Sequence, residues 1–462
     1  MAAIMTREMD RTSPPPAGEL RPFRFPAFVK RSLPGGLTVY AARLAGVPLF
    51  SLELSARAGA HRDPVEQAGL ATFTASVIDE GTRRRDSMEI AAWMERLGGY
   101  LVSAADWDTG YVAVAMLAQH LDAGLGLLAE IALTPTFPEK EIERLRQQRL
   151  AELMRRGYDP GAQADDRLAE VIYGGTPYSA PLLGREESLR TLDRDALLAF
   201  YDHHYSLAGA TVIAVGDLDP EDAVRRIEAS LAPRPGQEPA AAAPAIRPAP
   251  LAGISVHIVD RPGSSQTELR LGHAGVPRTH PEWFPLNVLN MVLGGKFTSR
   301  INLNLRERHS YTYGANSRFS GRLGPGPFVV DTAVATESTG AATKEVLGEL
   351  RRIREEPVEV QELEETLSYM IGVYPYTLQS VGDVAKRLEI LSVYGLPDDY
   401  YDTYLDRLAA VTREDLLNGA REHLHPDRIA VVAVGPADEL VPQFDGVGEV
   451  TVYRREPEPA AV

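Results

Sequence analysis

The sequence contains no cysteine among its 462 residues. This absence excludes disulfide bonds, thiolate zinc sites and cysteine nucleophiles together. It leaves the compartment open, because the cytosol and the periplasm both tolerate a chain without cysteine. Chemistry through a thiol is therefore ruled out, and location has to be argued from other features.

Long apolar runs are also missing at the N-terminus. Residues 1–20 mix charged side chains with Pro14, Pro15 and Pro16 and contain no apolar core. A signal peptide needs an apolar stretch of roughly 7–15 residues, and a membrane-spanning helix needs about 20. We therefore expect neither a signal peptide nor a membrane-spanning helix. The expected location is the cytoplasm, or the periplasm if a leader has been removed.

Positive charge is scarce relative to negative charge. The chain has 48 Lys and Arg against 64 Asp and Glu, which gives a formal net charge of -16. Nucleic-acid backbones and anionic membranes bind basic surfaces, and no basic stripe offsets this excess of acidic groups. We expect no nucleic-acid partner and no membrane partner.

Periodicity predicts a chain of mixed helices and strands. Apolar residues alternate with polar ones over 50–58, which is typical of a half-buried strand. Further strands are predicted over 211–217 and from 327 to about 335. Helical spacing predicts helices over 69–82, 87–98, 117–133, 139–156, 192–205, 343–354 and 360–371.

The order of elements recurs in the second half of the chain. Residues 192–198 match 411–417, and 215–216 match 434–435 at the same offset. A Pro/Ala segment over 232–250 interrupts the periodicity, and its composition suits a semi-extended linker. The repeat predicts an α+β fold with two homologous αβ domains in tandem.

This organisation divides the chain into five parts. They are a flexible N-terminal arm (1–27), a first domain (28–231), the linker (232–250), a second domain (251–455) and a tail (456–462). A chain of this length is long enough to bury a sizeable core in each domain.

The most specific passage runs from Leu293 to Tyr313. Gly294 and Gly295 follow an apolar run and predict a helix that ends in positive-φ geometry, with a second helix after it. Arg306 and Tyr313 are about two helical turns apart, so they share a face if that helix continues. A guanidinium and a phenol suit the binding of a carbonyl oxygen. The alternative is an Arg paired with a neighbouring Glu and a Tyr half-buried in the core.

This passage resembles the signature "LGGG-x-SSRL-x-x-x-LRE-x-x-GLAYSV" of insulinase-type (pitrilysin, inverzincin, M16) zinc peptidases, and the resemblance extends over nearly the whole chain. In that family a matching Arg and Tyr bind the substrate carbonyl, so the resemblance implies this role for Arg306 and Tyr313. Ser310, Tyr311 and Thr312 stand where the family usually has Gly-Leu-Ala.

The zinc motif of the family is missing. Catalytic members read "GLAHFLEHMLFKGT" where residues 69–82 read GLATFTASVIDEGT. Thr72 and Ser76 therefore stand where those members have their two His, and Ala75 stands where they have the Glu. Hydroxyl groups are poor zinc ligands and Ala cannot accept a proton. None of the ten histidines begins a His-x-x-Glu-His or His-Glu-x-x-His motif. Glu152 lies near the place of the family's third ligand, and we interpret it as a solvated helix residue.

Two short histidine clusters also suggest a metal site. They are 202–204, which reads Asp-His-His, and 422–425, which reads Glu-His-Leu-His. Each lies at a predicted helix end, where His favours the helix dipole and water, and no third ligand is spaced nearby. We therefore expect no metal site in this chain.

The resemblance implies a division of labour between two subunits. The family builds a clamshell from four LuxS/metallohydrolase-like domains, and in its short-chain branch each of two subunits contributes two. This chain resembles the non-catalytic subunit of such a heterodimeric zinc endopeptidase, inactive alone, which binds peptide substrates for a partner that carries His-x-x-Glu-His and the zinc. The alternative is a purely structural assembly subunit, like the core proteins of respiratory complexes that share the fold.

Overall fold

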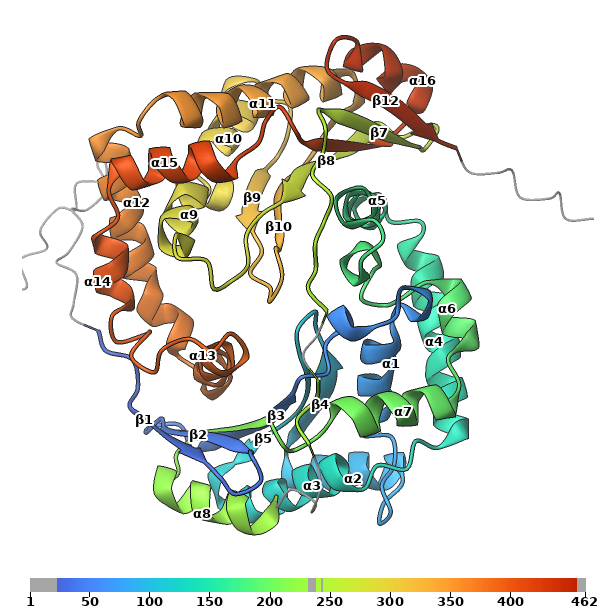
Figure 1. The fold of residues 1–462 in the computed structure, drawn as a ribbon, viewed down its shortest axis with the longest axis vertical. Helices are drawn as coiled ribbons and strands as arrows, with labels where there is room; N and C mark the ends of the chain where they lie inside the picture. The colour runs from blue at the N-terminus through green and yellow to red at the C-terminus, as the bar shows by residue number, and fades with distance from the viewer. Residues whose placement is uncertain (1–22, 232–237, 242–243, 455–462) are drawn as a thin grey trace, which may run out of the picture.

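The computed structural model describes residues 23–231, 238–241 and 244–454. It shows two six-stranded sheets, each flanked by helices (Figure 1). Most of the expected arm, parts of the expected linker and the expected tail lie outside the described residues.

The first sheet has the strand order β1-β2-β6-β3-β5-β4. Strands β2 and β6 are parallel and the other neighbours are antiparallel. Its strands are β1 (Phe28–Ser32), β2 (Thr38–Arg43), β3 (Leu49–Ala56), β4 (Tyr100–Ala105), β5 (Gly110–Leu117) and β6 (Thr211–Gly216).

Among the described residues, eight α-helices belong to the first half. They are α1 (Leu70–Val77), α2 (Ser87–Leu97), α3 (Leu121–Leu133), α4 (Glu139–Arg156), α5 (Pro160–Tyr173), α6 (Glu186–Thr191), α7 (Arg194–His204) and α8 (Pro220–Ser230). Side chains that accept backbone hydrogen bonds begin several of them, as Asp86 does for α2 and Asp193 for α7. The helix expected over 117–133 is shorter than predicted, because Leu117 still belongs to β5.

The second sheet has the order β12-β7-β11-β8-β10-β9. From its second strand onward, the pairing directions repeat those of the first sheet, with β7 and β11 parallel and the next neighbours antiparallel. Its strands are β7 (Ser255–Asp260), β8 (Gln266–Ala274), β9 (Ala315–Phe319), β10 (Pro327–Ala335), β11 (Ala430–Gly435) and β12 (Glu449–Tyr453).

Helices surround the second sheet in the same way. They are α9 (Trp283–Asn290), α10 (Arg300–Asn302), α11 (Thr339–Glu355), α12 (Val360–Val373), α13 (Val381–Val393), α14 (Tyr404–Ala409), α15 (Arg413–His423) and α16 (Ala437–Leu440). Two π-helical segments, η5 (Met291–Gly295) and η6 (Leu303–Arg308), lie on either side of α10.

Each half contributes one helix to the sheet of the other half. Helix α5 packs on β8 and β11, and α13 packs on β3 and β6 (Figure 1). Leu168 and Ile172 of α5 share an apolar cluster with Val432 of β11. Leu388 of α13 shares another cluster with Ile213 of β6. The two halves therefore form one packed unit, and the sequence periodicity predicts neither of these crossing helices.

The packing of α13 corrects the prediction for the strand over 50–58. Every residue of β3 from Phe50 to Ala56 is buried, so the strand is not half-buried. Ser55 and Thr109 both donate hydrogen bonds to Glu389 of α13, at 3.5 and 3.1 Å. The polar side of β3 thus faces a helix from the second half and not water.

Two segments expected to be loose pack on the rest of the chain. Phe25 is buried and stacks on Tyr401, with ring centroids 4.8 Å apart, in contrast to the flexible arm expected over 1–27. Ile246, near the end of the Pro/Ala segment, is buried in the cluster that contains Tyr178. Within the described ranges, no helix combines the length and apolarity needed to cross a membrane.

Candidate functional site

The start of helix α1 is set by a glycine and a buried carboxylate. Gly69 has a φ of +92°, and a Cβ there would lie 2.7 Å from the Gly184 Cα, so only glycine fits. The Asp63 carboxylate accepts hydrogen bonds from the amides of Gly69 and Ala71, both at 2.9 Å. Burial raises the pKa of Asp63 to about 7. These contacts fix the direction of α1 and hence the positions of its side chains.

The three positions aligned with the zinc motif lie on α1. The hydroxyl of Thr72, which is buried, donates to the Leu182 carbonyl at 2.5 Å. The hydroxyl of Ser76 donates to the Phe73 carbonyl at 2.8 Å, and Ala75 is fully buried. Both hydroxyl groups are therefore engaged within the protein, and the Ala75 methyl group offers no lone pair to a proton or a metal.

A guanidinium group occupies the space beside these positions. Arg149 of α4 donates to Thr72 Oγ1 at 2.9 Å, to the Thr72 carbonyl at 3.1 Å and to Ser76 Oγ at 3.3 Å. Burial lowers the pKa of Arg149 to about 10, so the side chain remains a cation near neutral pH. A fixed positive charge repels a second cation at short range. The residues present at α1 therefore do not fit a zinc ion.

Sequence reasoning missed Arg149. The only available signal is its spacing on the predicted helix over 139–156, which says nothing of where the guanidinium points. Glu152 follows three positions later, is exposed and favours the charged form of Arg149 through its own charge. Its exposure agrees with the interpretation of Glu152 as a solvated helix residue.

The segment that leads to Arg306 differs from the predicted helix end. Segment η5 continues α9, and neither Gly294 nor Gly295 has a positive φ. Gly294 instead permits a close approach, because a Cβ there would lie 2.4 Å from Ser317 Oγ on β9. The predicted positive-φ stop is therefore wrong, and the glycine serves the packing of η5 on β9.

Arg306 lies on η6 and keeps part of its guanidinium free. Its Cζ lies 4.3 Å from the ring centroid of Phe297, and its Nε lies 3.6 Å from Glu307 Oε1. Its Nη1 is buried and has no hydrogen-bond partner. The alternative of an Arg paired with a neighbouring Glu thus accounts for one nitrogen, while another still needs an acceptor.

Tyr313 lies in the loop after η6. That segment ends at Arg308, and Ser310 has a φ of +55°, so the chain turns before it reaches Tyr313. The helix does not continue to Tyr313, so the condition under which Arg306 and Tyr313 would share a helical face is not met. Tyr313 is 92% exposed, which also excludes a tyrosine half-buried in the core. Among the described residues, no hydrogen bond joins its hydroxyl to another group.

One buried side chain holds both ends of this passage. Asn302 donates from Nδ2 to the Phe297 carbonyl at 2.6 Å, and its Oδ1 accepts from the Ala315 amide at 3.0 Å. The first bond lies before Arg306 in the chain and the second just after Tyr313. The backbone is therefore held on both sides, while the Tyr313 ring remains in solvent.

The arrangement offers hydrogen-bond donors that can bind a carbonyl oxygen. The partly exposed guanidinium of Arg306 and the exposed phenol of Tyr313 are both donors. Helix α1 lies in the other half of the chain (Figure 1), and the Arg149 guanidinium beside it is neither a metal nor a general base. Of the residues predicted from the sequence, Thr72 and Ser76 lie together beside Arg149 in the first half. Arg306 and Tyr313 lie in the second half, apart from this group.

Comparisons with known proteins identify the family of the chain. Residues 45–186 match the family model described as Insulinase (Peptidase family M16), and residues 191–370 match the model described as Peptidase M16 inactive domain. An uncharacterized zinc protease of Streptomyces coelicolor is 24% identical over 414 residues, which are 88% of this chain and 89% of that protein. A protein of Helicobacter pylori named a non-peptidase homolog is 22% identical over 383 residues, 82% of this chain and 87% of that protein.

A solved structure shares the fold of both halves of the chain. The crystal structure of a peptidase M16 inactive domain from Pseudomonas fluorescens is similar with a TM-score of 0.82 and 27% identity, and covers 88% of this chain and 98% of that chain. The predicted fold class, α+β with two αβ units in tandem, is confirmed. Matches on both halves and a shared fold show that this chain belongs to the peptidase M16 (insulinase) family.

Proposed function

We propose that this chain is the substrate-binding subunit of a two-component zinc peptidase. Its partner is a second M16 chain that carries His-x-x-Glu-His and the zinc ion. This chain contributes Arg306 and Tyr313, which bind the carbonyl oxygen of the scissile peptide bond. The substrates are peptides.

The observation that supports the proposal best is the state of these two side chains. The Arg306 side chain is 33% exposed, its ion pair with Glu307 is long at 3.6 Å, and the hydroxyl of Tyr313 is exposed. A guanidinium presents several N–H donors, and those that reach solvent can bind a substrate carbonyl. Fold stability alone gives no reason for an exposed Tyr on a loop whose backbone is held.

The division of labour has a simple physical basis. A zinc-bound water and the donors that polarise the carbonyl act on different sides of a peptide bond, so they can belong to different chains. Arg306 and Tyr313 would stabilise the negative charge that develops on the carbonyl oxygen. The fixed cation at Arg149 means that this chain needs the partner for the attacking water.

Peptides would bind in an extended form by adding a strand to a sheet edge. Strands β4 and β9 each form one edge of a sheet, so in the part of the chain that the structure describes each has backbone groups without a neighbouring strand. Strand β9 begins two residues after Tyr313. A peptide paired with that edge would pass close to the phenol.

Reconstitution tests the proposal. The chain would be co-expressed with the candidate partner, and peptide cleavage would be measured for each chain alone and for the mixture. We expect cleavage by the mixture and none by this chain alone. Arg306→Ala should lower turnover by about 10²-fold or more if the guanidinium stabilises the oxyanion. Arg308→Ala, an exposed Arg at the end of the same segment, serves as the matched control.

Two results would contradict the proposal. A partner that is fully active without this chain would show that its donors are not used. A stable complex whose cleavage is unchanged by Arg306→Ala would instead favour the structural assembly subunit.

A further inference from the structure

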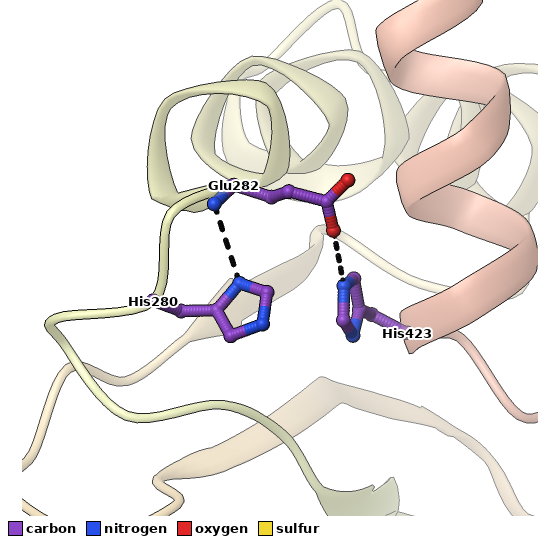
Figure 2. A group of neighbouring side chains, drawn as sticks. All are labelled: His280, Glu282 and His423. Atoms are coloured by element: carbon purple, nitrogen blue, oxygen red, sulfur yellow. Dashed lines mark hydrogen bonds and ion pairs between the residues drawn. The ribbon is translucent and has the colours of Figure 1, made fainter.

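Three potential metal ligands meet at the junction of α9 and α15. They are His280, Glu282 and His423, and their ligand atoms all lie within 4.8 Å of one another. His280 and Glu282 lie at the start of α9, and His423 is the last residue of α15 (Figure 2). The sequence-based expectation that no third ligand lies near the histidines of 422–425 is therefore wrong, because the fold supplies two from far away in the chain.

The cluster is held in place by its own contacts. His423 is buried, and its Nε2 lies 2.6 Å from Glu282 Oε2. The Nδ1 of His280 accepts a hydrogen bond of 3.3 Å from the Glu282 amide. Figure 2 shows the other ring nitrogen of His280 on the side that faces His423, and the two rings lie edge to face with centroids 4.8 Å apart.

The donor set matches a borderline divalent ion. Two imidazoles and one carboxylate are ligands that zinc accepts, with bonds of about 2.0–2.2 Å. Tetrahedral bonds of that length place ligand atoms about 3.4 Å apart. The contact of 2.6 Å between His423 and Glu282 would therefore open when an ion binds, and ligand atoms as far apart as 4.8 Å would move closer. The C-terminal end of α15 adds the negative end of a helix dipole beside the ring of His423.

Negative charge lies close to the cluster. The carboxylates of Glu282 and Glu422 are the acidic groups whose charges act on the His280 ring. Glu282 is itself one of the three ligands, and Glu422 precedes the ligand His423 in the chain. Both carboxylates favour a cation at this place.

We propose that His280, Glu282 and His423 bind one divalent transition-metal ion, of which zinc is the best match, with water in the fourth position. The ion links the start of α9 to the end of α15. It lies away from the α1 positions aligned with the zinc motif and takes no part in the proposed peptide cleavage. The proposal therefore does not depend on the function proposed above.

Zinc titration of the purified full chain tests this site. After removal of metals with a chelator, we expect one equivalent of Zn²⁺ to bind and to raise the melting temperature. Co²⁺ should give the visible absorption of a tetrahedral site with nitrogen and oxygen ligands. His280→Gln and Glu282→Gln should each weaken Zn²⁺ binding at least tenfold.

The choice of variants keeps the result independent of folding. His280→Gln leaves the contact between Glu282 and His423 intact, and Glu282→Gln retains an acceptor for His423 while it removes the charge. His203→Gln is the matched control, because His203 is an exposed histidine at the end of α7 in the first half. Wild-type protein without a bound equivalent of Zn²⁺ would overturn the proposal. Binding that survives both substitutions would do the same, and would leave Glu282 and His423 as a plain ion pair between two helices.

Discussion

Arg149 places a positively charged side chain beside the α1 positions that align with the zinc ligands of the family. Its guanidinium reaches Thr72 and Ser76 on α1 from the neighbouring helix α4. The positive charge is thus built into the fold and cannot polarise a water molecule as zinc does. Because it binds two hydroxyl groups and a carbonyl, this side chain should also contribute to stability.

We therefore expect Arg149→Met to destabilise the protein. Methionine keeps much of the packing on the Phe73 ring but leaves the Thr72 carbonyl without this donor, which should cost about 1–3 kcal/mol. Urea unfolding measures the loss. Arg155→Met, an exposed position on the same helix, should change the free energy of unfolding by less than about 0.5 kcal/mol. Equal stability of Arg149→Met and wild type would mean that the guanidinium does not hold α1 and α4 together.

The sequence predicts which residues belong to the candidate site better than it predicts how they are arranged. The residue types at Thr72, Ala75 and Ser76 already exclude a zinc helix, and the structure adds the cation that takes its place. The relation between Arg306 and Tyr313 could not be predicted, because Ser310 adopts a left-handed φ that few non-glycine residues adopt. The end of η6 at Arg308 and the turn at Ser310 together place Tyr313 in a loop.

Helices α5 and α13 carry most of the contact between the halves. Each covers the sheet of the other half, so each central strand is buried on both faces. Their positions depend on contacts between residues far apart in the sequence. Local periodicity carries no information about such contacts, whereas α4 has the bounds that the spacing predicts.

A substitution in α5 should loosen the opposite half. Leu168→Ala removes a buried side chain that packs with Val329 and Val432, and should cost about 2–5 kcal/mol. Amide hydrogen exchange should then become faster in β11, which lies in the other half. Leu127→Ala provides the comparison, because Leu127 is equally buried but belongs to a cluster within the first half. Equal acceleration of amide exchange in β11 by both substitutions would contradict the claim that α5 supports the sheet of the other half.

At the scale of the whole molecule, an ionisable pair lies between the two halves. Burial, together with the charge of Glu389 on α13, raises the pKa of Glu53 on β3 to about 8, against the opposing charge of Lys386. Asp106 also faces the pair and raises the pKa. Lys386 forms an ion pair with Glu389 and lies 3.9 Å from Asp106. The neutral form of Glu53 therefore stabilises the contact between the halves.

The sign of the resulting pH dependence follows from the raised pKa. The pKa of Glu53 in the unfolded chain is near the ordinary value of 4.5, so its contribution to stability is complete below that pH and is lost as the pH rises through about 8. We expect wild type to lose on the order of 3 kcal/mol more than Glu53→Gln between about pH 5 and pH 9.

Urea unfolding at several pH values measures this difference. Other buried carboxylates, such as Asp63 and Asp108, titrate in both proteins and cancel in the comparison. Glu66→Gln is the control, because Glu66 is exposed and should follow wild type. Parallel pH profiles for Glu53→Gln and wild type would show that Glu53 is not the group that titrates.

The fold class and the tandem arrangement could be predicted because helix and strand periods are local. The joining of the halves, the path of the Pro/Ala segment near Ile246 and the burial of Phe25 could not, since each depends on long-range packing. The same holds for the ligands that meet at His423. Side chains from separate elements meet only once the tertiary structure is known.

The central claim is that this chain holds the scissile carbonyl while a partner supplies the zinc. The most direct measurement is the turnover of the reconstituted complex with Tyr313→Phe, beside Tyr376→Phe, which alters another tyrosine that is 70% exposed. Loss of the Tyr313 hydroxyl should lower kcat by about 10²-fold, because the donor acts on charge that develops in the transition state. The control should retain the wild-type rate, and an equal rate for Tyr313→Phe would contradict the claim.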